Sequence, residues 1–150
     1  MIEAVEKGNL KKAEKLYTNY TAEKSKIRSG MRALMVAYAK DKQFSKAESM
    51  ITFIGDDKIL FDEYLRIKEF EIASKYIRWD YINDGKCQVK ELVDQMCKNG
   101  KKDDAIKYIT NNKSDIIHTG GHSSEKQKPD EKQKIGEEFY KELCDFVNNY

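Results

Sequence analysis

Apolar residues recur every three or four positions along most of this chain, a spacing that places them on one face of an α-helix. The clearest example is residues 92–109 (LVDQMCKNGKKDDAIKYI), which we interpret as two short helices joined by a tight turn. Asn99 and Gly100 mark the turn, because Gly and Asn most readily adopt the left-handed conformation that ends many helices. The apolar faces are formed by Leu92, Val93, Met96, Cys97, Ala105, Ile106, Tyr108 and Ile109. Such a hairpin cannot bury its apolar side alone, so we expect neighbours of the same kind.

The same pattern occurs in four segments, each with an apolar helix end, a lysine-rich turn, three residues and an alanine. The segments are AVEKGNLKKAEKLY, VAYAKDKQFSKAESMI, DEYLRIKEFEIASKYI and DQMCKNGKKDDAIKYI. Their alanines are Ala13, Ala47, Ala73 and Ala105. The intervals of roughly 26 to 34 residues are typical of helical-hairpin solenoids, in which each unit packs on its neighbours. We therefore predict an irregular α-solenoid, with an ordinary helical bundle as the alternative.

The rest of the chain completes this layout. Residues 31–40 are strongly apolar and predict a central helix. Residues 119–134 (TGGHSSEKQKPDEKQK) lack apolar side chains and predict a flexible polar loop. Residues 135–150 predict an amphipathic helix that caps the last open face of the stack. The expected fold is thus all-α: an array of about four helical hairpins over residues 1–118, the loop, and a C-terminal capping helix.

Composition narrows the class of protein. Of 150 residues, 36% are charged and 39% apolar, and the net charge is only +2, which counts mildly against a dedicated nucleic-acid binder. Three cysteines without a close pair indicate a reducing compartment rather than a disulfide framework. The first residues lack the apolar run of a signal peptide, and no apolar run approaches the roughly 18 residues of a transmembrane helix. We expect a cytoplasmic or nuclear protein, or one held on an organelle by a partner.

Candidate catalytic and metal-binding residues are few. His118 and His122 have a spacing that could place both imidazoles on one metal ion, but the intervening Gly120-Gly121 disfavours a helix. The cysteines form no CxxC motif, and no carboxylate is placed as a third ligand. Cys97 and Cys144 lie on apolar helix faces, where a small buried hydrophobe is the usual role of a cysteine. We therefore expect neither an enzyme nor a metal or cofactor site.

Most aromatic residues fall on expected core faces. Trp79 and Tyr81 lie beside an expected loop and could anchor a protein partner together with nearby arginines, since buried aromatic and arginine anchors supply most interface energy. The candidate partner-binding residues are Arg66, Arg78, Trp79 and Tyr81. Each could equally be an ordinary surface or packing residue.

Residues 92–109 and 34–51 resemble pentatricopeptide and tetratricopeptide hairpins. Pentatricopeptide RNA readers use a short polar residue two positions before the apolar pair of the first helix, where this chain has Arg32 and Lys90. Long basic residues there suit phosphate contact rather than base readout. RNA binding is the alternative function, with Arg32, Lys90, Lys98, Lys101 and Lys102 as its candidates.

A second resemblance covers residues 8–110. Four segments in succession resemble the C-terminal helical region of the core vacuolar-protein-sorting subunit of the HOPS and CORVET endosomal tethers. They are GNLKKAEKL (8–16), RAL (32–34), IGDDKILFDEYLRIKEFEIASKYI (54–77) and the hairpin 92–109. Lys68-Glu69 stands where that family has a glycine-containing turn. The resemblance implies a non-catalytic α-solenoid scaffold in endosomal or vacuolar vesicle-mediated transport. Its partners would be a SNARE-regulating protein or other tether subunits, and it would be cytoplasmic, held peripherally on endosome or vacuole membranes.

Overall fold

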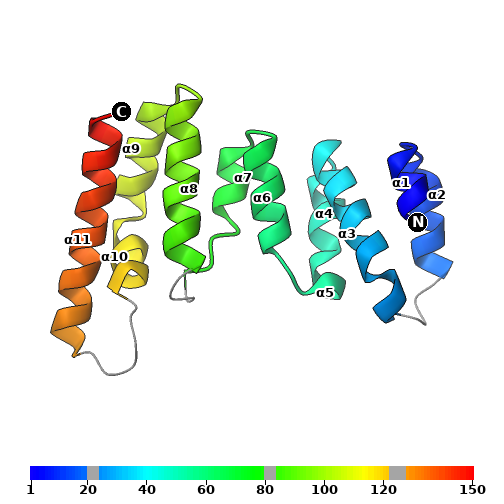
Figure 1. Cartoon of the computed structure of the whole chain (residues 1–150), viewed down its shortest axis with the longest axis horizontal. Helices are drawn as coiled ribbons and strands as arrows, with labels where there is room; N and C mark the ends of the chain where they lie inside the picture. The colour runs from blue at the N-terminus through cyan, green and yellow to red at the C-terminus, as the bar shows by residue number, and fades with distance from the viewer. Residues whose placement is uncertain (20–23, 80–83, 122–127) are drawn as a thin grey trace. The chain divides into compact units, whose positions relative to one another are not determined.

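The computed structural model describes residues 1–19, 24–79, 84–121 and 128–150, and every regular element in these ranges is a helix (Figure 1). The all-α prediction is therefore confirmed. The helices are α1 (Ile2–Glu6), α2 (Leu10–Asn19), α3 (Lys24–Lys40), α4 (Phe44–Ser49), α5 (Ile51–Ile54), α6 (Lys58–Arg66), α7 (Phe70–Ser74), α8 (Asp84–Lys98), α9 (Lys102–Asn111), α10 (Lys113–Gly121) and α11 (Pro129–Asn148). They form two compact units, Met1–Tyr76 and Ile77–Tyr150, each of which is described by itself.

Within the described residues, the same type of backbone turn joins the two helices in each of four hairpins: α1/α2, α3/α4, α6/α7 and α8/α9. Each turn has one residue with positive φ, namely Gly8 (68°), Lys42 (57°), Lys68 (63°) and Gly100 (73°). The next amide, of Asn9, Gln43, Glu69 or Lys101, donates to the carbonyl of Ala4, Tyr38, Tyr64 or Met96 at 2.8–2.9 Å. The positive-φ residue itself donates to the carbonyl three positions earlier, at 2.9–3.0 Å. This pair of bonds is the Schellman motif, which satisfies the last carbonyls of a helix.

The alanine that the sequence pattern places five residues after each positive-φ position is completely buried. Ala13, Ala47, Ala73 and Ala105 each have 0% exposure. Each amide donates to the carbonyl of the residue that follows the positive-φ position, at 2.9–3.1 Å, and this bond begins the second helix. A methyl side chain at this point leaves room for the first helix to pack closely. The repeated sequence pattern therefore corresponds to a repeated local structure.

Helix α3 is the centre of the first unit, as the apolar run at residues 31–40 predicts. It contacts α1, α2, α4, α5 and α6, so that the α3/α4 hairpin lies between the α1/α2 and α6/α7 hairpins (Figure 1). Its buried face is formed by Met31, Leu34, Met35, Tyr38 and Ala39. Two exposed ion pairs also join neighbouring hairpins, Lys46–Glu14 at 3.7 Å and Lys42–Glu69 at 2.7 Å. The hairpins of this unit thus pack in the order of the sequence.

The second unit packs α11 against α8, α9 and α10. Its core includes Val89, Leu92, Val93, Ile109, Ile116 and Leu143. Helices α10 and α11 approach each other closely at their glycines. A Cβ atom at Gly136 would lie 2.0 Å from the carbonyl oxygen of Ile117, and one at Gly121 would lie 2.1 Å from that of Lys132. Only residues without a side chain allow the two helices to approach so closely.

This contact corrects the expected loop at residues 119–134. Residues 119–121 belong to α10 and are buried, and residues 129–134 form the first turns of α11, which begins six residues before the expected Ile135. The intervening residues 122–127 lie outside the described part of the chain. The expected boundary after residue 118 also differs from the observed division after Tyr76.

A small buried polar cluster fixes the first residues of the second unit. The buried Gln88 accepts a hydrogen bond from the backbone amide of Arg78 through its side-chain oxygen at 2.8 Å. The buried Thr119 donates its hydroxyl to the carbonyl of Trp79 at 2.7 Å. A Cβ at Gly85 would lie 2.6 Å from the Arg78 carbonyl oxygen. The two hydrogen bonds satisfy backbone groups that lie outside any helix, as buried peptide groups require, and the Arg78 carbonyl leaves no room for a side chain at position 85.

Candidate functional site

The residues that we predicted as partner anchors are placed in different units. Arg66 ends α6 in the first unit, whereas Arg78 and Trp79 lie in the second. Tyr81 lies outside the described residues. Arg66 is therefore described with the first unit, and Arg78 and Trp79 with the second.

Arg66 is the best exposed of the predicted anchors that the structure describes. Its side chain is 58% exposed, and its Nε donates to both carboxylate oxygens of the buried Glu63 at 3.1 Å. These hydrogen bonds, and then the negative charge of Glu63, raise the pKa of the Arg66 guanidinium. Glu63 also holds the guanidinium in one orientation, which reduces the entropy that Arg66 would lose in binding.

Arg78 and Trp79 have a packing role. Both residues are half-buried, and their backbone groups bind Gln88 and Thr119 as described above. The Arg78 guanidinium lies 3.5 Å from Asp84 at the start of α8. The short segment that contains both residues is thus attached to α8 and α10.

The candidates for RNA binding are engaged with groups of the chain itself. Arg32 pairs with Asp56 at 3.3 Å, Lys98 with Asp94 at 2.6 Å, and Lys101 with Asp104 at 3.9 Å. Lys90 pairs with Glu142 at 3.8 Å, and Lys102 donates to the carbonyl of Asn148 at 3.1 Å. Arg32 belongs to the first unit and the four lysines to the second. An RNA phosphate would have to compete with carboxylates for most of these cations.

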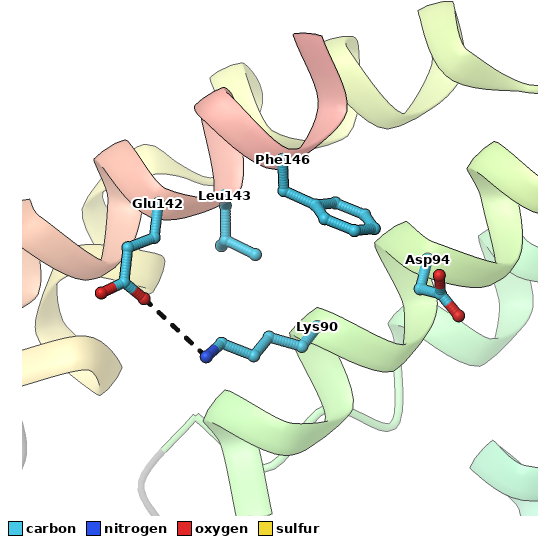
Figure 2. Close-up of a pocket in the computed structure, with 5 residues that line it drawn as sticks. All are labelled: Lys90, Asp94, Glu142, Leu143 and Phe146. Carbon is cyan, nitrogen blue, oxygen red and sulfur yellow. Dashed lines mark ion pairs between the residues drawn. The ribbon is translucent and has the colours of Figure 1, made fainter. Parts of the chain in front are cut away.

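A surface groove lies between α8 and α11, within the second unit (Figure 2). Its hollow has a volume of about 330 Å³. It is lined by Lys90 and Asp94 of α8 and by Glu142, Leu143 and Phe146 of α11. Leu143 is almost fully buried, whereas Phe146 is 42% exposed. The groove therefore offers a mainly apolar surface to a ligand, with charged groups along its edges.

Two side chains of opposite charge, Lys90 and Asp94, follow each other along α8 at the edge of the groove. Lys90 reaches across to Glu142 on α11 (Figure 2). Its Nζ also lies 5.4 Å from the centre of the Phe139 ring. Asp94 is one helical turn further along α8 and pairs with Lys98. The hydrogen bond to Asp94 is the main cause of a raised pKa at Lys98. One end of the groove thus carries an ammonium and the other end a carboxylate on the same helix.

An exposed pair of aromatic rings lies next to the hollow. Phe146 and Tyr150 are 42% and 52% exposed, and their ring centres are 5.8 Å apart in an edge-to-face arrangement. We did not predict this feature, because the expected apolar face of this helix runs through Phe139, Tyr140, Leu143, Cys144 and Val147. The signal in the sequence is that Phe146 and Tyr150 are four residues apart, a spacing that brings two side chains together on a helix beside that face.

The residues considered for catalysis or for binding a metal ion are His118, His122 and the cysteines. His118 lies exposed on α10, and His122 falls outside the described residues. Burial, and then the charge of Asp94, raises the pKa of the Cys97 thiol, which makes it a poorer nucleophile. Among the described residues, no three His, Cys, Asp or Glu side chains gather where they could hold a metal ion.

Comparison of the chain with protein-family models, with curated proteins and with solved structures finds no match. None of the described helices combines the length and the apolar character needed to cross a membrane. The functional proposals that follow therefore rest on the local geometry of the hairpins and the groove and on the sequence resemblance of residues 8–110.

Proposed function

We propose that this chain is a non-catalytic α-solenoid scaffold that binds another protein. The supporting observation is the recurrence of one Schellman turn and one buried alanine in α1/α2, α3/α4, α6/α7 and α8/α9. In this proposal the hairpins stack in sequence order along the whole chain, with α11 covering the last one. Stacked hairpins present an extended surface that can bind a long partner segment with little rearrangement.

The process we propose is endosomal or vacuolar vesicle tethering, on the basis of the sequence resemblance of residues 8–110 to the HOPS and CORVET subunit. The chain would then be cytoplasmic and held on the membrane by its partners. A SNARE-regulating protein or another tether subunit would be the bound protein. Arg66 is the proposed anchor, because it is exposed and held in place by Glu63.

Affinity purification of the full chain from native extract, with mass spectrometry, tests this proposal. The matched variants are Arg66→Gln, which keeps a donor for Glu63, and Lys75→Gln, which removes an exposed charge elsewhere in the first unit. We expect vacuolar-sorting subunits with the wild type and with Lys75→Gln, and a reduced yield with Arg66→Gln. The purification should be repeated after nuclease treatment and at two salt concentrations.

The same purification separates protein binding from RNA binding. A protein partner should survive nuclease treatment. RNA binding should disappear with nuclease and weaken steeply with salt, because each phosphate contact releases counterions. Recovery of only RNA-processing proteins, lost on nuclease treatment, would contradict the proposed function.

A further inference from the structure

We propose that the groove between α8 and α11 binds the same face of a second copy of this chain, related by a two-fold axis. The hollow of about 330 Å³ has Leu143 and Phe146 as its apolar lining and is open to solvent. Filling it with a large apolar side chain would remove this lining from water, which is the main favourable term in association.

The surface around the groove carries an exposed aromatic side chain, Phe146, that could fill the same hollow on a second copy. Phe146 is 42% exposed at the edge of the hollow, and its contact with Tyr150 limits the orientations of the ring. In a two-fold dimer each copy uses the same surface, so a projection on one copy meets a hollow on the other. We place the axis across the groove, so that α8 packs antiparallel to its counterpart and α11 does the same. The Phe146 ring of each copy then enters the hollow of the other.

The order of charges on α8 fits this antiparallel arrangement. Lys90 and Asp94 both line the hollow and are four residues apart, so they lie about 6 Å from each other along one side of the helix. Reversing the direction of a second α8 places Lys90 opposite Asp94 of the second copy, and Asp94 opposite Lys90. The ion pair of Lys90 with Glu142 is long and exposed, at 3.8 Å with side chains 57% and 67% exposed. Lys90 can therefore turn from Glu142 towards the second copy without losing a strong contact. Asp94 already pairs with Lys98 at 2.6 Å, and in the dimer its two carboxylate oxygens would accept from both ammonium groups.

The mixed charges also argue against a peptide of uniform charge as the occupant. A basic segment would meet Lys90, and an acidic segment would meet Asp94 and Glu142, at the edges of the same hollow. Like charges in contact are unfavourable and favour partners with the complementary order. On α8, the face of a second copy has that order when it is reversed. This inference does not depend on the proposed function.

Analytical ultracentrifugation of the full chain over a wide concentration range tests the proposal. We expect a monomer–dimer equilibrium. Phe146→Ala should weaken the dimer about tenfold or more, because truncating a central aromatic anchor commonly costs more than 1.4 kcal/mol. The matched control is Phe53→Ala, because Phe53 is 54% exposed on α5 of the first unit and should not affect the dimer. A wild-type chain that stays monomeric at all concentrations overturns the proposal, as does a dimer that Phe146→Ala leaves intact.

Charge reversal tests the antiparallel order of α8. In the Lys90→Glu variant, the new carboxylate of each copy lies opposite Asp94 of the other copy. In the Asp94→Lys variant, the new ammonium group of each copy lies opposite Lys90 of the other copy. Each variant should be monomeric where the wild type is a dimer. An equimolar mixture should regain the dimer, because every opposed pair then has opposite charges. Recovery in the mixture also shows that both variants are folded, whereas a mixture that stays monomeric, with both variants folded by circular dichroism, overturns the proposed arrangement.

Discussion

Replacing Lys68 by glycine should stabilise the chain, although it removes a side chain. Lys68 has a φ of 63° in the turn between α6 and α7, and its side chain is exposed. Its amide donates to the carbonyl of Leu65 at 3.0 Å, and that of Glu69 donates to Tyr64 at 2.9 Å. Both bonds belong to the backbone, so the substitution leaves them in place.

The size of the effect follows from two opposed terms. The left-handed conformation costs roughly 1–2 kcal/mol for a residue with a Cβ atom, and glycine avoids this strain. Glycine loses roughly 0.5–1 kcal/mol more backbone entropy on folding. The net gain for Lys68→Gly is therefore about 0.5–1 kcal/mol in the free energy of unfolding, or about 1–4 °C in Tm for a chain of 150 residues. Lys42→Gly should gain less, because Lys42 also pairs with Glu69 at 2.7 Å.

Thermal and urea unfolding followed by circular dichroism would measure this gain. The matched control is Lys75→Gly, because Lys75 is also an exposed lysine at a helix end but has a φ of −70°. Glycine at that position should destabilise the chain by up to about 1 kcal/mol. An equal loss of stability in both variants would refute the reasoning, because Lys68 would then not be held in the left-handed conformation.

Three further outcomes are expected. Gly136→Ala should lower the free energy of unfolding in urea by about 3 kcal/mol or more, because its Cβ would lie 2.0 Å from the Ile117 carbonyl oxygen; a small effect would mean that α10 and α11 are further apart. Tyr108→Phe should raise stability to heat by about 1 kcal/mol, because the buried Tyr108 hydroxyl has no hydrogen-bond partner among the described residues; a loss of that size would indicate a partner. Burial, and then the charge of Glu48, raises the pKa of Tyr64 from 10.0 to about 12. The free energy of unfolding measured in urea should therefore fall as pH rises above 10, because only the unfolded tyrosine ionises there. Tyr64→Phe should make this decline less steep.

The hairpins could be predicted from sequence because their signals are local. A helix end, a left-handed residue and a buried alanine lie within about ten residues, so Gly100 and Ala105 identify a turn without knowledge of the rest of the fold. Even Lys68 and Lys42 adopt the same turn without glycine. The surrounding helices there override the preference of a single residue. The placement of the two units relative to each other has no such local signal.

The helix pair α10/α11 could not be predicted in this way. Gly120 and Gly121 disfavour a helix by about 1 kcal/mol each in isolation, so their sequence indicates a loop. The structure shows why they are tolerated. Both are buried against α11, and the close approach at Gly136 requires glycine on the other side as well. Such a contact between distant segments outweighs local propensity, and it is visible only once the two helices are placed together.

The predicted partner anchors that the structure describes differ in their exposure. Arg66 is exposed, as a partner anchor requires, but Arg78 and Trp79 are half-buried and attached by their backbones to Gln88 and Thr119. The groove between α8 and α11 was not predicted, because it depends on which turns of two distant helices face each other. Lys90 was singled out for RNA binding, and the structure places it at the edge of this groove.

The most direct test of the repeated hairpin is hydrogen exchange measured by NMR on the full chain. The decisive amides follow the left-handed residue of each turn and belong to Asn9, Gln43, Glu69 and Lys101. If the turns are equivalent, these amides exchange slowly, and the backbone couplings of Lys42 and Lys68 have the values of a positive φ. Fast exchange at Gln43 and Glu69, with protection only after the glycines, would contradict the claim that one turn is repeated along the chain.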